Sequence, residues 1–107
     1  MARHAPSRSD LLTLLRAHET ELRQRGVESV TLFGSVARGD AGVDSDVDLA
    51  IRPGAGFSAG GFDHFGRIEA LREHLAALLV RDVDLVEEPA RNPRLRQIIE
   101  QEGVRAF

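Results

Sequence analysis

The chain has 107 residues and a formal net charge of −3, and it is expected to fold as one domain, residues 1–107, because a core of this size seldom divides into two stable units. Hydrophobic residues make up 42% and charged residues 29%, which excludes a disordered chain. The absence of cysteine excludes disulfides, zinc–thiolate sites and a cysteine nucleophile, and the negative charge argues against direct nucleic-acid binding.

Nothing in the sequence predicts a membrane protein. No apolar run approaches the roughly 20 residues that span a bilayer, and residues 1–6 lack the apolar stretch of a signal peptide. We therefore expect a cytoplasmic protein with no membrane partner.

The N-terminal third predicts a helix followed by a strand. Ser7 and Asp10 fit a capping box, and leucines at helical spacing continue the helix to about Arg25, before Gly26 ends it. These leucines are Leu11, Leu12, Leu14, Leu15 and Leu22. Residues 28–33 then form a short run of β-prone side chains, which predicts a strand.

The middle of the chain predicts a turn, a strand and a loop. Residues 34–45 are rich in turn-forming residues, with one helical turn expected over 36–38. A second strand is expected over 46–51, because apolar and acidic side chains alternate there. One face carries Val47, Leu49 and Ile51, and the other carries Asp46, Asp48 and Ala50. The glycine-rich stretch 53–61 is expected to be a loop.

The C-terminal half predicts a helix, a strand and a second helix. Asp63 fits the N-cap of a long helix with a broad apolar stripe that should cover the sheet, formed by Phe65, Ile68, Leu71, Leu75, Leu78 and Leu79. Residues 82–86 repeat the alternation of the second strand. Asn92 and Pro93 fit the start of a last helix and Gly103 its end, with a core face of Leu95, Ile98 and Ile99. The predicted fold class is therefore α/β with a small sheet.

Asp46 and Asp48 are the most informative pair in the sequence. On one strand their side chains point the same way, about 6.6 Å apart along the chain, so both carboxylates can converge on one ion. Like charges held so close cost folding energy unless a cation lies between them. Carboxylate oxygens are hard ligands, and in a chain without cysteine they favour magnesium or manganese.

Gly34 and Ser35 directly follow the first predicted strand. A glycine lets backbone N–H groups approach a bound anion, and the Ser35 hydroxyl can donate a further hydrogen bond, so this end of the site suits phosphate. A phosphate-binding turn beside a two-carboxylate metal platform fits phosphoryl or nucleotidyl transfer, although hydrolases use similar parts.

Two motifs carry a family resemblance. Gly-Ser-Val-Ala-Arg-Gly at 34–39 and Ser-Asp-Val-Asp-Leu at 45–49 resemble the signature G-S-x-A-R-G followed by S-D-x-D-L of the minimal nucleotidyltransferases, a branch of the DNA polymerase beta superfamily. The resemblance covers most of the chain. It implies the nucleotidyltransferase fold, in which a small mixed β-sheet is flanked by helices.

The resemblance also implies ATP as co-substrate and two magnesium ions. Asp46 and Asp48 would bind the ions that clamp the ATP triphosphate, and the nucleotide-binding residues would be Gly34, Ser35, Arg38 and Ser45. The family's third catalytic and metal-binding acid comes from the strand after the long helix, which points to Asp84 as the acceptor of the proton from the incoming hydroxyl. Asp82 shares that strand face, so the choice between Asp82 and Asp84 stays open.

A protein partner is the further implication. Members of this family are typically antitoxins that transfer AMP from ATP to tyrosine hydroxyls of a HEPN-domain ribonuclease toxin and thereby inactivate it. A chain of 107 residues has no room for a domain that holds the acceptor, so a partner must supply that surface in a hetero-oligomer. With no tyrosine, the chain cannot label itself on that residue type.

Other interpretations stay open. An isolated pair of strand aspartates is more often solvated, and Arg38 beside Asp40 and Asp44 also fits a surface ion pair. A degenerate copy would act as a non-catalytic antitoxin that binds the toxin alone, and a less favoured alternative is nucleotide transfer to a small molecule. Glu87 and Glu88 are expected to end the third strand and are interpreted as a solvated turn. The four histidines show no metal-ligand spacing and are interpreted as structural or solvated: His4, His18, His64 and His74.

Overall fold

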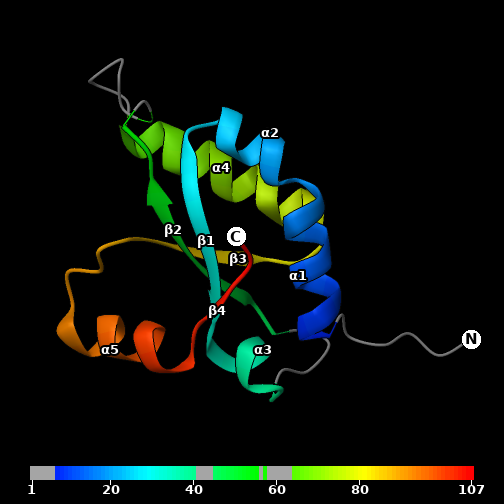
Figure 1. The fold of residues 1–107 in the computed structure, drawn as a ribbon, viewed down its shortest axis with the longest axis vertical. Coiled ribbons are helices and arrows are strands. Elements are labelled where there is room, and N and C mark those ends of the chain that lie inside the picture. The colour runs from blue at the N-terminus through cyan, green and yellow to red at the C-terminus, as the bar shows by residue number, and fades with distance from the viewer. Residues whose placement is uncertain (1–6, 41–44, 56, 58–63) are drawn as a thin grey trace, which may run out of the picture.

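The computed structural model describes residues 7–40, 45–55, 57 and 64–107. It consists of a four-stranded sheet with helices on both faces, which confirms the predicted α/β class (Figure 1). In chain order the elements are α1 (Arg8–Ala17), α2 (Glu19–Gln24), β1 (Val27–Phe33), α3 (Gly34–Arg38), β2 (Val47–Pro53), α4 (His64–Leu79), β3 (Val83–Glu87), α5 (Pro93–Glu102) and β4 (Val104–Arg105).

The sheet is mixed, with strand order β3-β2-β1-β4. β1 is antiparallel to both β2 and β4, whereas β2 and β3 are parallel. Parallel neighbours need a long crossover, and α4 supplies it between β2 and β3. The predicted strands are all present, with ends that differ from the predicted ones by a few residues.

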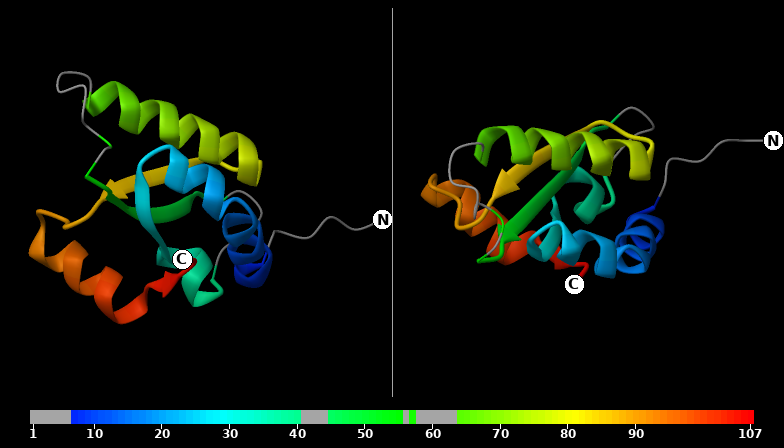
Figure 2. Two further views of the ribbon diagram at one scale, coloured as in Figure 1. Left: turned by 45° about the horizontal axis from the view of Figure 1, so that its top comes forward. Right: turned by 90° about the horizontal axis from the view of Figure 1, so that it is seen from above.

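The core lies on both faces of the sheet. On one face, the alternating aliphatic residues of β2 are fully buried against leucines of α1, α2 and α4, as predicted: Val47, Leu49 and Ile51. On the other face a smaller cluster forms beneath α5, consisting of Phe33, Ala50, Ala90 and Ile99. Figure 2 shows α4 and α5 on opposite sides of the strands. The Asp48 side of β2 is therefore only partly covered, and this keeps it accessible.

The prediction of one N-terminal helix is wrong, because the helix is broken at His18. His18 has φ −106° and ψ 17°, outside the helical region, and it separates α1 from α2. The break allows Leu15 before it and Leu22 after it to be fully buried in the same core. The capping box of Ser7 and Asp10 is confirmed.

The predicted apolar stripe of α4 is only partly correct. Leu71, Leu75 and Leu79 are buried, but Phe65 is 78% exposed. At 100° per residue, Phe65 lies about 120° around the helix from Leu71 and so points away from the sheet. Asp63, the predicted N-cap, lies outside the described residues, as does most of the loop predicted over 53–61.

The C-terminal helix is confirmed and the strand after it was not predicted. The Asn92 side chain accepts hydrogen bonds from the backbone N–H groups of Arg94 and Leu95, at 2.9 and 3.3 Å, and α5 ends before Gly103. β4 has two residues, too few for a recognisable alternation, and pairs with Thr31 and Leu32 of β1. No helix in the described part of the chain is long and apolar enough to cross a membrane.

Candidate active site

Two acidic side chains lie beside each other on the parallel strands β2 and β3. Asp48 is the direct register partner of Asp84, so their Cα atoms are one strand spacing, about 4.8 Å, apart. On its other side Asp48 pairs with Phe33, the last residue of β1. Strand pairing, which is independent of sequence distance, therefore places both carboxylates at the point where β1 ends.

Gly34 packs directly against the Asp48 carboxylate. Its φ of +77° lies in the left-handed region, and a Cβ atom at this position would come within 2.1 Å of the Asp48 Oδ2 atom. Only glycine satisfies both the backbone angle and the close approach. The first residue of the Gly-Ser motif and the second aspartate of the Asp-x-Asp motif are therefore in contact.

The pKa of Asp48 reflects both its burial and the two acidic side chains near it. Burial raises the pKa of Asp48 above its usual value, and the negative charges of Asp84 and Asp46 raise it further, together with a side-chain hydrogen bond to Asp84. The Arg38 guanidinium partly offsets this effect. Two neighbouring carboxylates thus act on Asp48, and its ionised form is disfavoured in the absence of a cation.

Asp46 lies further out than the pair of Asp48 and Asp84. It is exposed, directly before β2, and it lines a cavity of about 620 Å³ between the start of β2 and the end of α4. Asp82 lines the same cavity, and its backbone carbonyl accepts a hydrogen bond from Val47 N–H at 2.9 Å. The structure therefore places Asp84 beside Asp48, and Asp82 on the cavity side with Asp46.

The predicted phosphate-binding residues Ser35 and Arg38 both lie on α3, one at its start and the other at its end. Ser35 is half-buried in the first turn of α3, next to Gly34. Arg38, at the end of α3, forms ion pairs with Asp40 at 3.0 Å and with Glu102 of α5 at 3.6 Å. The predicted alternative of a surface ion pair between Arg38 and Asp40 is therefore observed, while Asp44 lies outside the described residues.

The donor set is compatible with a hard divalent cation. Among the described residues, no three histidine, cysteine, aspartate or glutamate side chains are arranged so as to hold a metal ion by themselves. The pair of Asp48 and Asp84 supplies two adjacent carboxylates, and the charge of Asp46 also acts on Asp48. Magnesium commonly takes one or two protein carboxylates and completes its shell with phosphate oxygens and water, so the residues present fit it.

Sequence reasoning missed Arg81, the residue that anchors the loop before β2. Its guanidinium donates a hydrogen bond to the Ser45 backbone carbonyl, and both residues line the 620 Å³ cavity. The neighbouring Val80 has φ +54°, which is unusual for a β-branched residue, and is 83% exposed. No local pattern could have predicted the contact, because the two partners are 36 residues apart.

The described histidines lie away from the acid pair. His64 contacts Glu87 at the end of β3, His74 contacts Glu21 of α2, and the Nδ1 atom of His18 lies 2.9 Å from the Leu14 carbonyl. These contacts agree with a structural role. Glu87 is the exposed last residue of β3 and Glu88 lies in the bend directly after it, as expected for a pair that ends this strand.

Comparison with known proteins identifies the family to which this geometry belongs. The model of the nucleotidyltransferase domain matches residues 15–106, which is most of the chain. The chain belongs to the nucleotidyltransferase family. The match extends from α1 to β4 and includes both predicted motifs, so the family resemblance inferred from Gly34–Gly39 and Ser45–Leu49 is confirmed, as is the enzyme class.

Individual nucleotidyltransferases agree with this assignment. The protein adenylyltransferase MntA of Thermococcus cleftensis is 38% identical over 81 residues, which cover 72% of this chain and 73% of the relative. A solved structure described as a candidate minimal nucleotidyltransferase is 34% identical, with a TM-score of 0.66, and covers 87% of this chain and 93% of that chain. A toxin–antitoxin structure with AMP-PNP is 26% identical, also with a TM-score of 0.66, and covers 86% and 72% respectively.

Proposed function

We propose that this nucleotidyltransferase is an antitoxin that transfers AMP from ATP to tyrosine hydroxyls of a HEPN-domain ribonuclease toxin and thereby inactivates the toxin. The observation that carries the proposal is the contact of Gly34 with Asp48, the register partner of Asp84, which brings the acidic motif and the Gly-Ser motif together. The relative MntA is named a protein adenylyltransferase, and a toxin–antitoxin structure with an ATP analogue shares the fold. The HEPN identity of the toxin rests on the family resemblance.

In this proposal the acidic residues hold two magnesium ions. Asp46, Asp48 and Asp84 would be the protein ligands, and the ions would neutralise the triphosphate charge and favour the ionised acceptor hydroxyl. A cation at this position would also remove the penalty that burial and like charges impose on ionised Asp48. The same side chains would therefore destabilise the metal-free chain and stabilise the chain that has bound magnesium.

The remaining motif residues are assigned to the nucleotide. Gly34 and Ser35 would present backbone N–H groups and a hydroxyl to the terminal phosphates, and Ser45, two residues before β2, would add a further contact to the nucleotide. Arg38 would exchange its exposed carboxylate partners, Asp40 and Glu102, for phosphate oxygens. This exchange costs little because exposed ion pairs contribute little to stability.

The proposed reaction is an in-line displacement at the α-phosphorus atom of ATP. The tyrosine oxygen forms a bond to this phosphorus, the bond from phosphorus to the β-phosphate oxygen breaks, and pyrophosphate leaves. Asp84 would accept the proton of the tyrosine hydroxyl. The chain contains no tyrosine, so the acceptor must come from another protein.

The test is transfer of label from ATP to the toxin in the presence of magnesium. Asp46→Asn, Asp48→Asn and Asp84→Asn are each expected to lower the transfer rate by roughly 10²–10³-fold, because each removes a charge that would hold the metal ions against the reacting phosphates. Asp82→Asn is the matched control, since Asp82 is exposed and lies only two residues before Asp84 but is not the register partner of Asp48, and it should keep the wild-type rate.

Three outcomes would contradict the proposal. Full activity of Asp48→Asn would refute the metal assignment, and loss of activity in Asp82→Asn but not in Asp84→Asn would exchange the third acid. Toxin protection in cells by Asp48→Asn at the wild-type level would show a non-catalytic antitoxin. Melting temperatures of all variants, measured in parallel, separate lost chemistry from lost folding.

A further inference from the structure

A second cleft lies at the end of the sheet opposite to the acidic residues. It has a volume of about 440 Å³ and opens where α2 ends, β1 begins and β2 ends. β1 runs six residue steps from Val27 to Phe33, so the cleft is about 20 Å from Gly34 and Asp48. The described residues that line it are Arg23, Gln24, Arg25, Gly26, Val27, Glu28, Gly54 and Arg67.

The charged residues that line the cleft are mainly basic, although the whole chain carries a net negative charge. The described lining of the cleft includes Arg23, Arg25 and Arg67 but a single acidic residue, Glu28, whereas the whole chain has a formal net charge of −3. Three arginines, from α2, from the turn after it and from α4, thus line one opening. A concentration of one charge sign in a cleft attracts ligands of the opposite sign.

Two of the arginines are held in place by neutral backbone carbonyls. Arg23 donates from Nη1 to the carbonyl of Glu28, at 2.9 Å, where the register of β1 is shifted by a bulge, and it also pairs with Glu19 at 2.7 Å. Arg67 donates from Nη1 to the carbonyl of Phe57 at 2.6 Å. A carbonyl orients a guanidinium without cancelling its charge, so the remaining donors of Arg67 stay available for an anion, whereas Glu19 already offsets part of the Arg23 charge.

Arg25 is the least engaged of the three. It is exposed, and its side chain has no hydrogen-bond or ion-pair partner within the part of the chain that the structure describes. The adjacent Gly26 has φ +95° and packs against Phe57, where a Cβ atom would come within 3.0 Å of the Phe57 Cα atom. This turn has the geometry that brings Arg25 beside Arg67.

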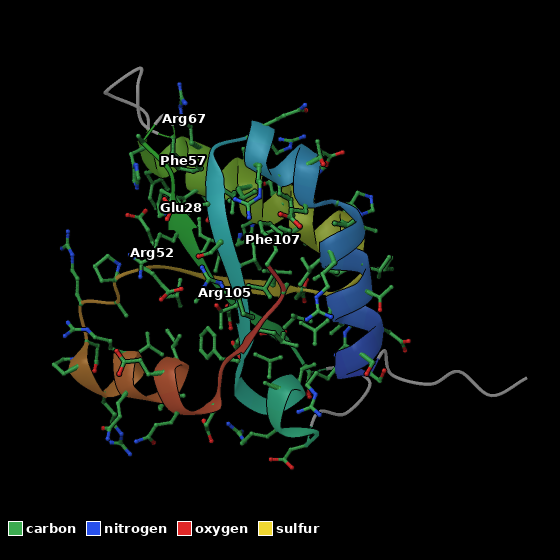
Figure 3. All side chains as sticks on the ribbon, viewed as in Figure 1. Glu28, Arg52, Phe57, Arg67, Arg105 and Phe107 are labelled. Atoms are coloured by element: carbon green, nitrogen blue, oxygen red, sulfur yellow. The ribbon has the colours of Figure 1, made fainter. Side chains whose placement is uncertain are left out.

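An apolar hollow continues from the charged cleft. It has a volume of about 180 Å³, it shares Arg25 and Arg67 with the cleft, and its other described walls are Phe57, Ala70 and Leu71. Figure 3 shows Arg67 and Phe57 close together at this end of the sheet, with Glu28 next to them. A group of cations therefore borders directly on a small apolar recess.

We propose that the cleft and the hollow together bind an acidic polypeptide segment, with carboxylates on the three arginines and a neighbouring apolar side chain in the hollow. Arginine binds carboxylates through paired N–H donors, which suits this arrangement. A free phosphate or a nucleic-acid backbone would leave the apolar hollow unused, whereas an apolar side chain of a polypeptide can fill it. The origin of the segment rests on the proposed function: it would belong to the protein that accepts AMP. Binding of the segment in the cleft would anchor that protein about 20 Å from the acidic residues.

Direct binding measurements test this inference. The probe is a fluorescein-labelled peptide of alternating glutamate and leucine, followed by fluorescence anisotropy with the full chain, and the comparison probes are the glutamine–leucine peptide, inorganic tripolyphosphate and a single-stranded oligonucleotide. We expect the glutamate–leucine peptide to bind most tightly. Its affinity should fall as salt is added, because the partner charges are exposed.

Charge reversal provides the matched control. Arg25→Glu with Arg67→Glu is expected to weaken binding of the glutamate–leucine peptide about tenfold or more. Arg91→Glu with Arg94→Glu, two exposed arginines near the start of α5, changes the net charge equally and should leave the affinity unchanged. Arg25→Glu alone should weaken binding in the same direction without removing a side-chain hydrogen bond or ion pair between described residues, so a folding defect of the double variant does not block the test.

The outcomes separate this inference from the proposed function. Absence of peptide binding, equal effects of the two double variants, or tighter binding of tripolyphosphate or the oligonucleotide with the same dependence on Arg25 would each overturn it. Magnesium-dependent ATP binding should be unchanged in Arg25→Glu with Arg67→Glu. If wild-type chain binds the peptide but neither ATP nor toxin label is observed, the proposed function fails while the acidic-segment site stands.

Discussion

At the scale of single residues, Gly34 combines two separate demands. Its positive φ alone disfavours any side chain, and the Asp48 carboxylate occupies the space that a Cβ atom would need. Gly39, five residues later, has a similar φ of +81°, but a Cβ atom placed there would meet nothing within 4 Å among the described residues. The two glycines therefore separate the cost of the backbone angle from the cost of displacing Asp48.

Replacement of these glycines gives a direct prediction. Gly39→Ala should cost about 1–2 kcal/mol of unfolding free energy, the typical penalty for a left-handed residue with a Cβ atom. Gly34→Ala should cost more than Gly39→Ala and should also lower magnesium-dependent ATP affinity, because the alanine methyl must push Asp48 away. Urea denaturation and calorimetry measure the two effects, and equal results for both variants would contradict the assigned contact.

Asp48 makes stability depend on pH in a defined direction. Because its folded-state pKa is raised, its favourable contribution is fully present below the unfolded value of 3.8 and is lost as the pH rises through the folded pKa. Asp48→Asn should therefore stabilise the metal-free chain at about pH 7, and by less at about pH 4.

The measurement is urea denaturation of both proteins at the two pH values, without divalent ions. Leu75→Ala is the control, because it removes a fully buried side chain and no titratable group, so its effect should be the same at both values. A stabilisation by Asp48→Asn that is larger in acid would show that the sign of the Asp48 contribution is wrong.

At the scale of elements, α4 buries only part of the apolar stripe that its sequence predicts. The stripe predicted from hydrophobicity included Phe65, yet only the part from Leu71 to Leu79 is buried. We expect Phe65→Ser to change the unfolding free energy by less than about 0.5 kcal/mol. Leu75→Ala should cost about 2–5 kcal/mol, because it leaves a cavity against the sheet.

Thermal or urea unfolding of these two variants checks the orientation of α4. A large loss of stability in Phe65→Ser would place this ring in the core, as the sequence pattern predicted. Retained stability together with weaker binding of a partner would instead identify Phe65 as part of an interaction surface.

Short elements escaped prediction for a related reason. β4 has two residues and exists because it pairs with β1, supported by Arg16 of α1, which donates hydrogen bonds to the carbonyls of Arg105 and Ala106 at 3.1 and 2.8 Å. The break at His18 likewise serves the packing of helices on either side of it. Both features depend on contacts between distant segments, so no local window of sequence contains them.

At the scale of the whole molecule, the sheet separates two regions of opposite charge. The acids lie at the end where β1 stops and β2 begins, and the arginine cleft lies where β1 begins and β2 stops. α4 extends along the sheet on one face, and α5 covers part of the other (Figures 1 and 2). The proposed nucleotide site at one end of the sheet and the proposed peptide site at the other therefore do not overlap, although the chain has only 107 residues.

The sequence by itself determined the class of fold, most helices and strands, and the Gly34–Gly39 and Ser45–Leu49 motifs, because hydrophobic periodicity, caps and motif spacing are local properties. Tertiary structure alone decided which acid stands beside Asp48, since Asp82 and Asp84 have the same local pattern and only the register of β2 with β3 distinguishes them. It also brought Arg25 and Arg67 together from segments 42 residues apart, because packing of Gly26 against Phe57 joins these segments, and no sequence pattern encodes that contact.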